Sequence, residues 1–200
     1  MECINKFLEI VENELGRYIK EIDKESIQKA AQLILECEKN GNRVHVTGIG
    51  KPGHVAGYIA SLLSSTGTSA YELHGTEAVH GSCGQVKPGD VVIAISNSGE
   101  TIELQATVDA LLNNDARIIC CSGNEESTLA KHAEVCLKAH VDQEGDTLNK
   151  PPRASILAEM LILQCLSIVL QDAKNLDVNQ YVKWHPGGSL GKGIKEMLEN

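Results

Sequence analysis

Apolar residues at helical spacing predict two helices at the start of the chain. In the first segment they recur every three or four residues, which is typical of an amphipathic helix. These residues are Ile4, Phe7, Leu8, Val11, Leu15 and Tyr18. A second helix is predicted from about residue 26 to residue 40, and Gly41 follows it as a natural stop. We therefore expect N-terminal helices over residues 1–40.

After Gly41, strand-like and helix-like patterns alternate. Apolar and β-branched runs predict strands at residues 43–47, 69–73, 91–95, 117–121 and 135–141. Helical patterns lie between them at residues 54–64, 101–112 and 127–133. This alternation predicts a doubly wound α/β domain, a five-stranded parallel sheet with helices on both faces. We expect the flavodoxin-like strand order 2-1-3-4-5.

The last third of the chain begins with a long apolar helix from about residue 153. Glu159 and Gln164 interrupt its apolar stretch, which falls short of a clean membrane span, so we expect a buried helix and no membrane. A glycine-rich turn at residues 184–191 and a short tail helix follow. Because no linker or repeat is visible, residues 1–200 are expected to form one domain, in which 43–175 hold the sheet and 176–200 the turn and tail.

Composition narrows the classes of function. The formal net charge is −9 and no basic block occurs, which excludes a nucleic-acid-binding surface. The seven cysteines are an odd set without paired metal-ligand spacing, and no charged-then-apolar leader opens the chain. Reduced thiols in the cytoplasm and no bound metal are the expectation.

The loop after the third predicted strand is rich in hydroxyl groups. It supplies Ser96, Asn97, Ser98 and Thr101, and Gly99 allows close approach of the backbone. A helix is predicted to begin there, and free amides at a helix N-terminus suit a phosphate group. The alternative is an ordinary turn in which Ser98 caps the helix.

The loop after the first predicted strand also points to a phosphate ligand. Residues 48–53 match G-x-G-x-x-G, and Glu72 could accept a ribose hydroxyl, so a nicotinamide-dependent oxidoreductase stays open. Lys51 is unusual in a pyrophosphate-binding turn, however. A dinucleotide would also not need the second hydroxyl-rich loop at the same switch point of the sheet. A small phosphoester is therefore favoured.

Several ionisable side chains near these loops are candidates for proton transfer. Aldose–ketose isomerisation needs a base beside a carbonyl, a partner acid and a cation near the developing enediolate oxygen. The candidates are Glu100, Glu103, Glu144, His54, His80 and His185. Other readings stay open: Glu103 would compensate a helix dipole, Glu144 would lie in a solvated acidic loop, and His185 would only shape a turn.

Four motifs together resemble a known family. They are GIGKPGH (48–54), EAVHG (77–81), SNSGET (96–101) and HPGGSLG (185–191). The chain is similar to the SIS (sugar isomerase) domain of arabinose-5-phosphate isomerases, without the CBS repeats that long members carry at the C-terminus.

The resemblance implies a cofactor-free isomerase that acts on a sugar phosphate through a cis-enediol(ate). Its catalytic set would be Lys51, Glu103, Glu144 and His185. Gly50, Ser65 and His80 would join the phosphate loop in binding the substrate. The family also implies a homo-oligomer, dimer or tetramer, whose active sites are shared between subunits. A non-catalytic phosphosugar-binding regulator is the alternative within the same fold.

This chain departs from the family pattern at two places near the expected site. Pro52 stands where family members generally have serine, and residues 152–156 replace a serine- and threonine-rich segment. Arg153 lies in that segment, and its planar guanidinium suits phosphate or carboxylate groups. We therefore hypothesise that Arg153 takes over part of the anion recognition.

Overall fold

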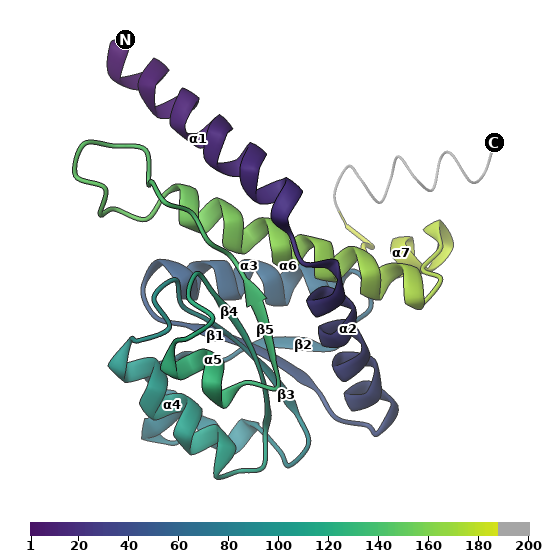
Figure 1. Ribbon diagram of the computed structural model, residues 1–200. Helices are drawn as coiled ribbons and strands as arrows, with labels where there is room; N and C mark the ends of the chain where they lie inside the picture. Colours follow the sequence, from purple (N-terminus) through teal and green to yellow (C-terminus); the bar gives the residue numbers. More distant parts are fainter. Residues whose placement is uncertain (188–200) are drawn as a thin grey trace, which may run out of the picture.

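A five-stranded parallel sheet forms the centre of the protein, which is described over residues 1–187 by a computed structural model (Figure 1). The strand order is β2-β1-β3-β4-β5, which confirms the expected α/β class and order. The strands are β1 (Val44–Gly48), β2 (Ala70–Glu72), β3 (Val91–Ile95), β4 (Arg117–Ser122) and β5 (Val135–Lys138). The expected tail helix and the end of the glycine-rich turn lie outside the described residues.

Helices cover both faces of the sheet. They are α1 (Glu2–Glu21), α2 (Lys24–Lys39), α3 (Lys51–Ser65), α4 (Ile102–Leu112), α5 (Thr128–His132), α6 (Ala154–Ala173) and α7 (Val178–Trp184). Buried side chains of α2, α3 and α6 pack on one face, and those of α4 and α5 on the other. Two short 3-10 turns at Ala78–His80 and Ser82–Gln85 and the helix α7 were not expected from the sequence.

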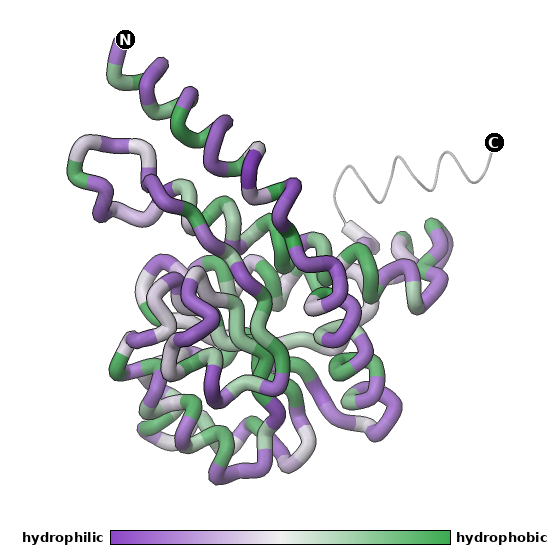
Figure 2. Tube along the Cα trace, viewed as in Figure 1, coloured by the Kyte–Doolittle hydropathy of each residue, from purple (hydrophilic) through white to green (hydrophobic). Residues whose placement is uncertain are grey.

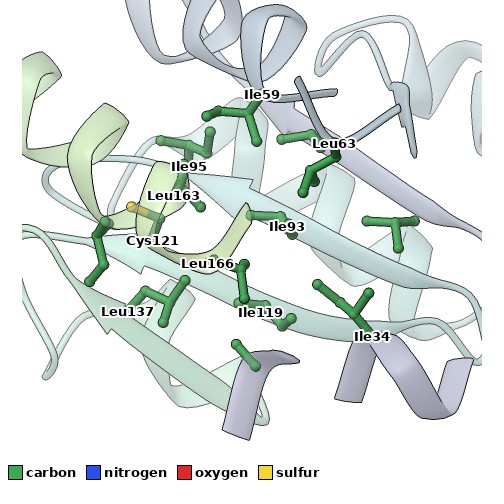
Figure 3. Close-up of a cluster of buried hydrophobic side chains, with 14 of the residues drawn as sticks. Ile34, Ile59, Leu63, Ile93, Ile95, Ile119, Cys121, Leu137, Leu163 and Leu166 are labelled. Atoms are coloured by element: carbon green, nitrogen blue, oxygen red, sulfur yellow. The ribbon is translucent and has the colours of Figure 1, made fainter. Parts of the chain in front are cut away.

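The core is built on β3, whose five residues are all buried. Ile93 and Ile95 point to the α2, α3 and α6 side, and Val92 and Ala94 point to the α4 side. Figure 3 shows side chains from these three helices and from β3, β4 and β5 meeting in one cluster. A strand that is covered on both faces has a continuous apolar run, which is why β3 was plain in the sequence.

The apolar helix α6 lies in the core, as expected. By length and composition it could cross a membrane, but half of its most apolar window is buried within the fold, and core helices of soluble proteins pass the same test. Its residues Ala158, Ile162, Leu163, Leu166 and Leu170 belong to the main apolar cluster. Figure 2 shows hydrophobic residues concentrated in the strands and along this helix.

Polar contacts attach the second half of the helix α1 to the body. The Tyr18 hydroxyl donates to the Lys138 carbonyl at 2.8 Å, and Arg17 pairs with Glu14 and Asp142. In the first half, Phe7 lies against Gly145 of the loop after β5, while Ile4 and Leu8 are exposed (Figure 1). The described residues therefore cover the apolar residues of this half only in part.

Candidate active site

The sheet register brings the two loops singled out in the sequence together. Gly48 at the end of β1 pairs with Ile95 at the end of β3, so the segments that follow both strands start side by side. α3 begins after the first loop and α4 after the second, on opposite faces of the sheet. This is the point where the strand order reverses, and ligands of doubly wound sheets bind there.

The loop after β3 is held in one shape by its own hydroxyl groups. The Gly99 amide donates to Ser96 Oγ at 3.1 Å, and Ser96 Oγ lies 3.3 Å from Thr101 Oγ1. Gly99 has a φ of +67°, and a Cβ added to it would collide with Ser127. A side chain is excluded here for both reasons. The loop is thus preformed, with Asn97 and Ser98 exposed.

The amides at the start of α4 are free to bind an anion. Thr101 is the N-cap of α4, and within the described chain no side chain caps this helix. Ser98 Oγ instead accepts the Glu100 amide at 3.2 Å, so the alternative in which Ser98 caps the helix is wrong. Uncapped amides and the partial positive charge of a helix N-terminus suit a phosphate group.

The two glutamates that follow the loop have different surroundings. The Glu100 carboxylate accepts the Thr128 amide at 2.8 Å and the Gln105 side-chain amide at 2.9 Å. The hydrogen bond from the Thr128 amide is the main cause that lowers the pKa of Glu100. Glu100 therefore supports the start of α5. Glu103 is the second residue of α4, and its side chain is exposed at the same helix end as the loop.

The loop after β1 leads into α3 at Lys51. Gly50 takes a φ of +66° as the N-cap of α3, Lys51 is the first residue of the helix, and Pro52 is the second. A Cβ on Gly48 would lie 2.8 Å from the Pro52 carbonyl carbon, so the turn is tightly folded. Lys51 is exposed, and it follows β1 at the end of the sheet where the β3 loop also begins. A cavity of about 190 Å³ opens next to this turn, lined by His54 and Glu72 among others.

Glu144 lies in a third loop at the same edge of the sheet. The segment after β5 reaches the β3 loop through Gly123, whose amide donates to the Asn97 carbonyl at 2.9 Å and whose carbonyl lies 3.1 Å from His140 Nδ1. The Glu144 side chain is buried, and its Oε2 accepts the amides of Arg153 at 2.6 Å and Ser155 at 3.1 Å. Glu144 thus caps the N-terminus of α6, and the solvated-loop reading of this residue is wrong.

The side chain of Arg153 lies beside this cap. Its guanidinium forms an ion pair with Asp146, and it is exposed. Together with Phe7 of α1 and the loop that contains Gly145, it lines a groove of about 390 Å³. An anion that binds Arg153 would therefore have to compete with Asp146, and the role suggested for Arg153 stays a prediction.

Comparison with known proteins identifies the family. A family model described as the SIS domain matches residues 38–168, a segment that contains both phosphate-loop candidates and Glu144. The chain belongs to the SIS domain family. The expected resemblance is thereby confirmed.

Two relatives of this SIS domain are named arabinose 5-phosphate isomerase. The chain is 38% identical over 176 residues to arabinose 5-phosphate isomerase KdsD of Francisella tularensis. The aligned segment covers 88% of this chain and 54% of the relative. Arabinose 5-phosphate isomerase KpsF of Escherichia coli O6:H1 is also 38% identical, with 88% and 53% covered. The chain thus spans about half the length of the curated relatives it matches.

A solved structure of similar architecture carries a ligand. The c3406 protein of E. coli CFT073 in complex with arabinose 5-phosphate has a TM-score of 0.81 and 29% identity, with 92% of this chain and 94% of that chain covered. The NanR protein of Vibrio vulnificus complexed with ManNAc-6P has a TM-score of 0.74 and 19% identity, with 98% and 67% covered, and shows the shared fold alone.

Two of the expected site residues lie away from the loops of this SIS domain. Ser65 ends α3, and its hydroxyl donates to the Leu62 carbonyl at 2.8 Å. Lys51 begins the same helix, so about 21 Å of helix rise separates the two residues. His185 follows α7, where its Nδ1 lies 2.8 Å from the Tyr181 carbonyl and its ring stacks on Tyr181 at 3.9 Å.

The helix α6 separates His185 from Glu144. Glu144 caps the first turn of α6, whereas α7 follows the last turn. Figure 1 shows α7 and the loop that precedes α6 at opposite ends of this helix. A helix of this length is about 30 Å long. One chain therefore does not bring His185 to Lys51 and Glu103. His80 lies in the first 3-10 turn, where it is exposed.

Sequence reasoning missed Glu159, the most unusual ionisable side chain of the domain. It is 0% exposed, and among the described residues neither carboxylate oxygen has a hydrogen-bond partner. Burial, and secondarily the charge of Glu144, raises the pKa of Glu159 to about 8. The signal was available, since Ser155, Glu159 and Ile162 follow the buried helical spacing of α6.

All seven cysteines lie in the described part of the chain, and none forms a disulfide there. Over residues 1–187, no group of three or more His, Cys, Asp or Glu side chains is arranged to hold a metal ion.

Proposed function

We propose that this SIS domain is a sugar-phosphate aldose–ketose isomerase that works through a cis-enediol(ate). The observation that carries the proposal is the meeting of two helix N-termini, those of α3 and α4, at the switch point. The uncapped amides of α4 suit the phosphate, and Lys51 and Glu103 lie in the first turns of these two helices. Relatives named arabinose 5-phosphate isomerase make that pentose phosphate the first substrate to test.

The roles of the side chains follow from the proton movements of the reaction. A base takes the proton from carbon 2 of the open-chain aldose, and the electron pair moves to the carbonyl oxygen to form the enediolate. The proton then returns at carbon 1, and carbon 2 becomes the carbonyl as its hydroxyl proton passes to the oxygen on carbon 1. We assign the carbon-bound proton to Glu103 or Glu144 and the stabilisation of the enediolate oxygen to Lys51. No cofactor or metal is required by this scheme.

His185 enters the scheme only through a second copy of the chain. Its position beyond the far end of α6 supports a homo-oligomer in which one subunit supplies His185 to the site of another. The apolar face at the start of α1, with Ile4 and Leu8 exposed, supports an interface between copies. In that position His185 would assist ring opening or relay a proton.

We also propose that residues 1–200 form one domain that acts in the cytoplasm without nucleic-acid or membrane partners. The free cysteines and the net charge of −9 support this placement. Limited proteolysis that released a stable fragment much shorter than the chain would contradict the single domain.

A thermal-shift screen over pentose and hexose phosphates, followed by turnover assays on the compounds that bind, tests the function. We expect sugar phosphates to raise Tm more than inorganic phosphate at the same concentration, since the sugar adds contacts to the shared phosphate seat. We also expect an aldose phosphate to be converted to its ketose. Binding of sugar phosphates without any turnover would favour the regulator instead.

A further inference from the structure

The first turns of α6 carry three polar atoms that are buried without partners. They are Ser155 Oγ and both carboxylate oxygens of Glu159, and within residues 1–187 no hydrogen bond reaches them. Both side chains are 0% exposed. Because native proteins satisfy nearly all of their buried polar groups, three unsatisfied atoms in one place call for an explanation.

Burying Glu159 works against stability. Transfer of an ionised carboxylate into an apolar core is so costly that the group stays protonated instead, in keeping with the raised pKa. A glutamine or an apolar residue of similar size would remove most of this penalty. Residues that break a stability rule in this way concentrate at functional sites.

Glu159 lies one turn of α6 beyond Ser155, whose amide binds Glu144. Ser155 and Glu159 are one helical turn apart, so their side chains lie on the same face of α6. The Ser155 amide donates to Glu144 Oε2 at 3.1 Å. Glu144 therefore binds the first turn of α6, and Glu159 lies one turn further along the helix, where it feels the charge of Glu144.

The other titratable groups around Glu159 are Tyr18 of α1, Cys121 of β4 and, next to Tyr18, Cys165 of α6 itself. Burial raises the pKa of the Tyr18 phenol and of the Cys121 thiol. Both groups are therefore uncharged at the pH at which Glu159 titrates. Figure 3 places Cys121 beside Leu163, one turn beyond Glu159 on α6. The charged group that acts on Glu159 is therefore Glu144, whose negative charge raises the pKa of Glu159.

We propose that Glu159 is a positioning residue that holds a proton beside Glu144, so that the pair carries a single negative charge during isomerisation. This inference rests on the proposed function and deepens it. Two neighbouring carboxyl groups in a low dielectric share one charge, because a second charge is strongly disfavoured. Once Glu159 ionises, its charge opposes both Glu144 and the anionic enediolate.

The test compares the pH dependence of kcat/KM for arabinose 5-phosphate in the unaltered protein and in Glu159→Gln. The unaltered protein should lose up to about tenfold per pH unit above about pH 8. In Glu159→Gln this inflection should vanish or move upward, because glutamine mimics the protonated acid and cannot ionise. Glu14→Gln is the control, since Glu14 is also a buried carboxyl but pairs with Arg17, and the fall should persist in it.

The role of Glu159 and the isomerase activity can be refuted by different results. An alkaline inflection that stays in place in a folded, active Glu159→Gln variant would overturn the role of Glu159 and leave the isomerase proposal intact. Absence of turnover in the unaltered protein would overturn the proposed function and this role with it. Thermal unfolding of the variant, expected to occur at a higher temperature than in the unaltered protein, confirms that it is folded.

Discussion

At the scale of single residues, the site depends on a few positions where the chain accepts an unfavourable local state. Gly99 holds a positive φ against Ser127, and Glu159 is buried without a partner among the described residues. Each is a local cost that the surrounding fold has to offset. Such residues can be tested separately from the chemistry, because their effect on stability has a definite sign.

Gly99→Ala should destabilise the protein by about 1–3 kcal/mol, because alanine adds a strained φ and a collision with Ser127. Urea unfolding measures the difference. Gly16→Ala is the matched control: Gly16 lies within α1, and a Cβ there meets no atom within 4 Å. This control should be stabilising by roughly 0.5–1 kcal/mol. Equal unfolding free energies of the Gly99→Ala variant and the unaltered protein would contradict the constraint on the β3 loop.

The stability of the protein should fall with rising pH because of Glu159. Its pKa is raised from 4.5 in the unfolded chain to about 8 in the fold, so its contribution is complete below about pH 4.5. That contribution is lost as the pH rises towards 8, at no more than roughly 1.4 kcal/mol per pH unit. Glu159→Gln should remove this slope. Urea unfolding at several pH values measures it, and parallel curves for the two proteins would contradict a buried neutral acid.

At the scale of elements, the candidate site residues lie on loops and at helix ends, and the sheet sets the positions of these loops and helix ends. α4 begins uncapped at the β3 loop, whereas α6 begins with its amides bound to Glu144. Glu144 thus has a structural role, binding the amides of Arg153 and Ser155, as well as a proposed chemical role. Any test of this residue has to separate the two.

The Glu144→Gln variant separates the structural role of Glu144 from its proposed chemical role. The amide oxygen of Glu144→Gln can still accept the amides of Arg153 and Ser155, so Tm should change little, while the loss of a base should lower kcat by about 100-fold to 10,000-fold. Glu103→Gln is the comparison, because Glu103 is exposed and caps nothing in the described chain. pH–rate profiles of both variants assign the base. Full activity in both would exclude the proposed mechanism.

Much of this element scale was predictable from the sequence. β3 was found because it is buried on both faces, and the strand order expected from the alternating pattern already put the two loops side by side. α7 was missed because it is short, although Asp177 accepts the Gln180 amide as a regular N-cap. The burial of Glu159 could have been predicted from the helical spacing of α6. The capping of α6 by Glu144 depends on a contact between two segments that no local pattern connects, so hydrophobic periodicity could not predict it.

At the scale of the whole molecule, the separation of His185 from Lys51 is the main constraint. The length of α6 keeps the two apart in one chain. Ser65 was expected at the site from the resemblance, but it ends α3 at the side away from Lys51. A site that includes His185 therefore needs a second subunit, and this requirement can be measured without knowing the interface.

Mixing two inactive variants tests the shared site. Lys51→Met and His185→Ala should each lose most of the activity, and their unfolded chains should regain activity when refolded together. If each site takes one residue from each of two subunits, about a quarter of the sites in an equal mixture are intact. Turnover of the mixture relative to the unaltered protein gives this fraction. A mixture no more active than the separate variants would contradict a shared site.

The most direct test of the isomerase claim is proton exchange in deuterated water. Arabinose 5-phosphate incubated with the protein should form the ketose and acquire carbon-bound deuterium next to the carbonyl, as seen by NMR, because an enediolate exchanges its proton with the solvent through the base. Glu144→Gln and Glu103→Gln provide the controls for an enzymatic origin. Tight binding of the sugar phosphate with neither ketose nor carbon-bound deuterium would contradict the account.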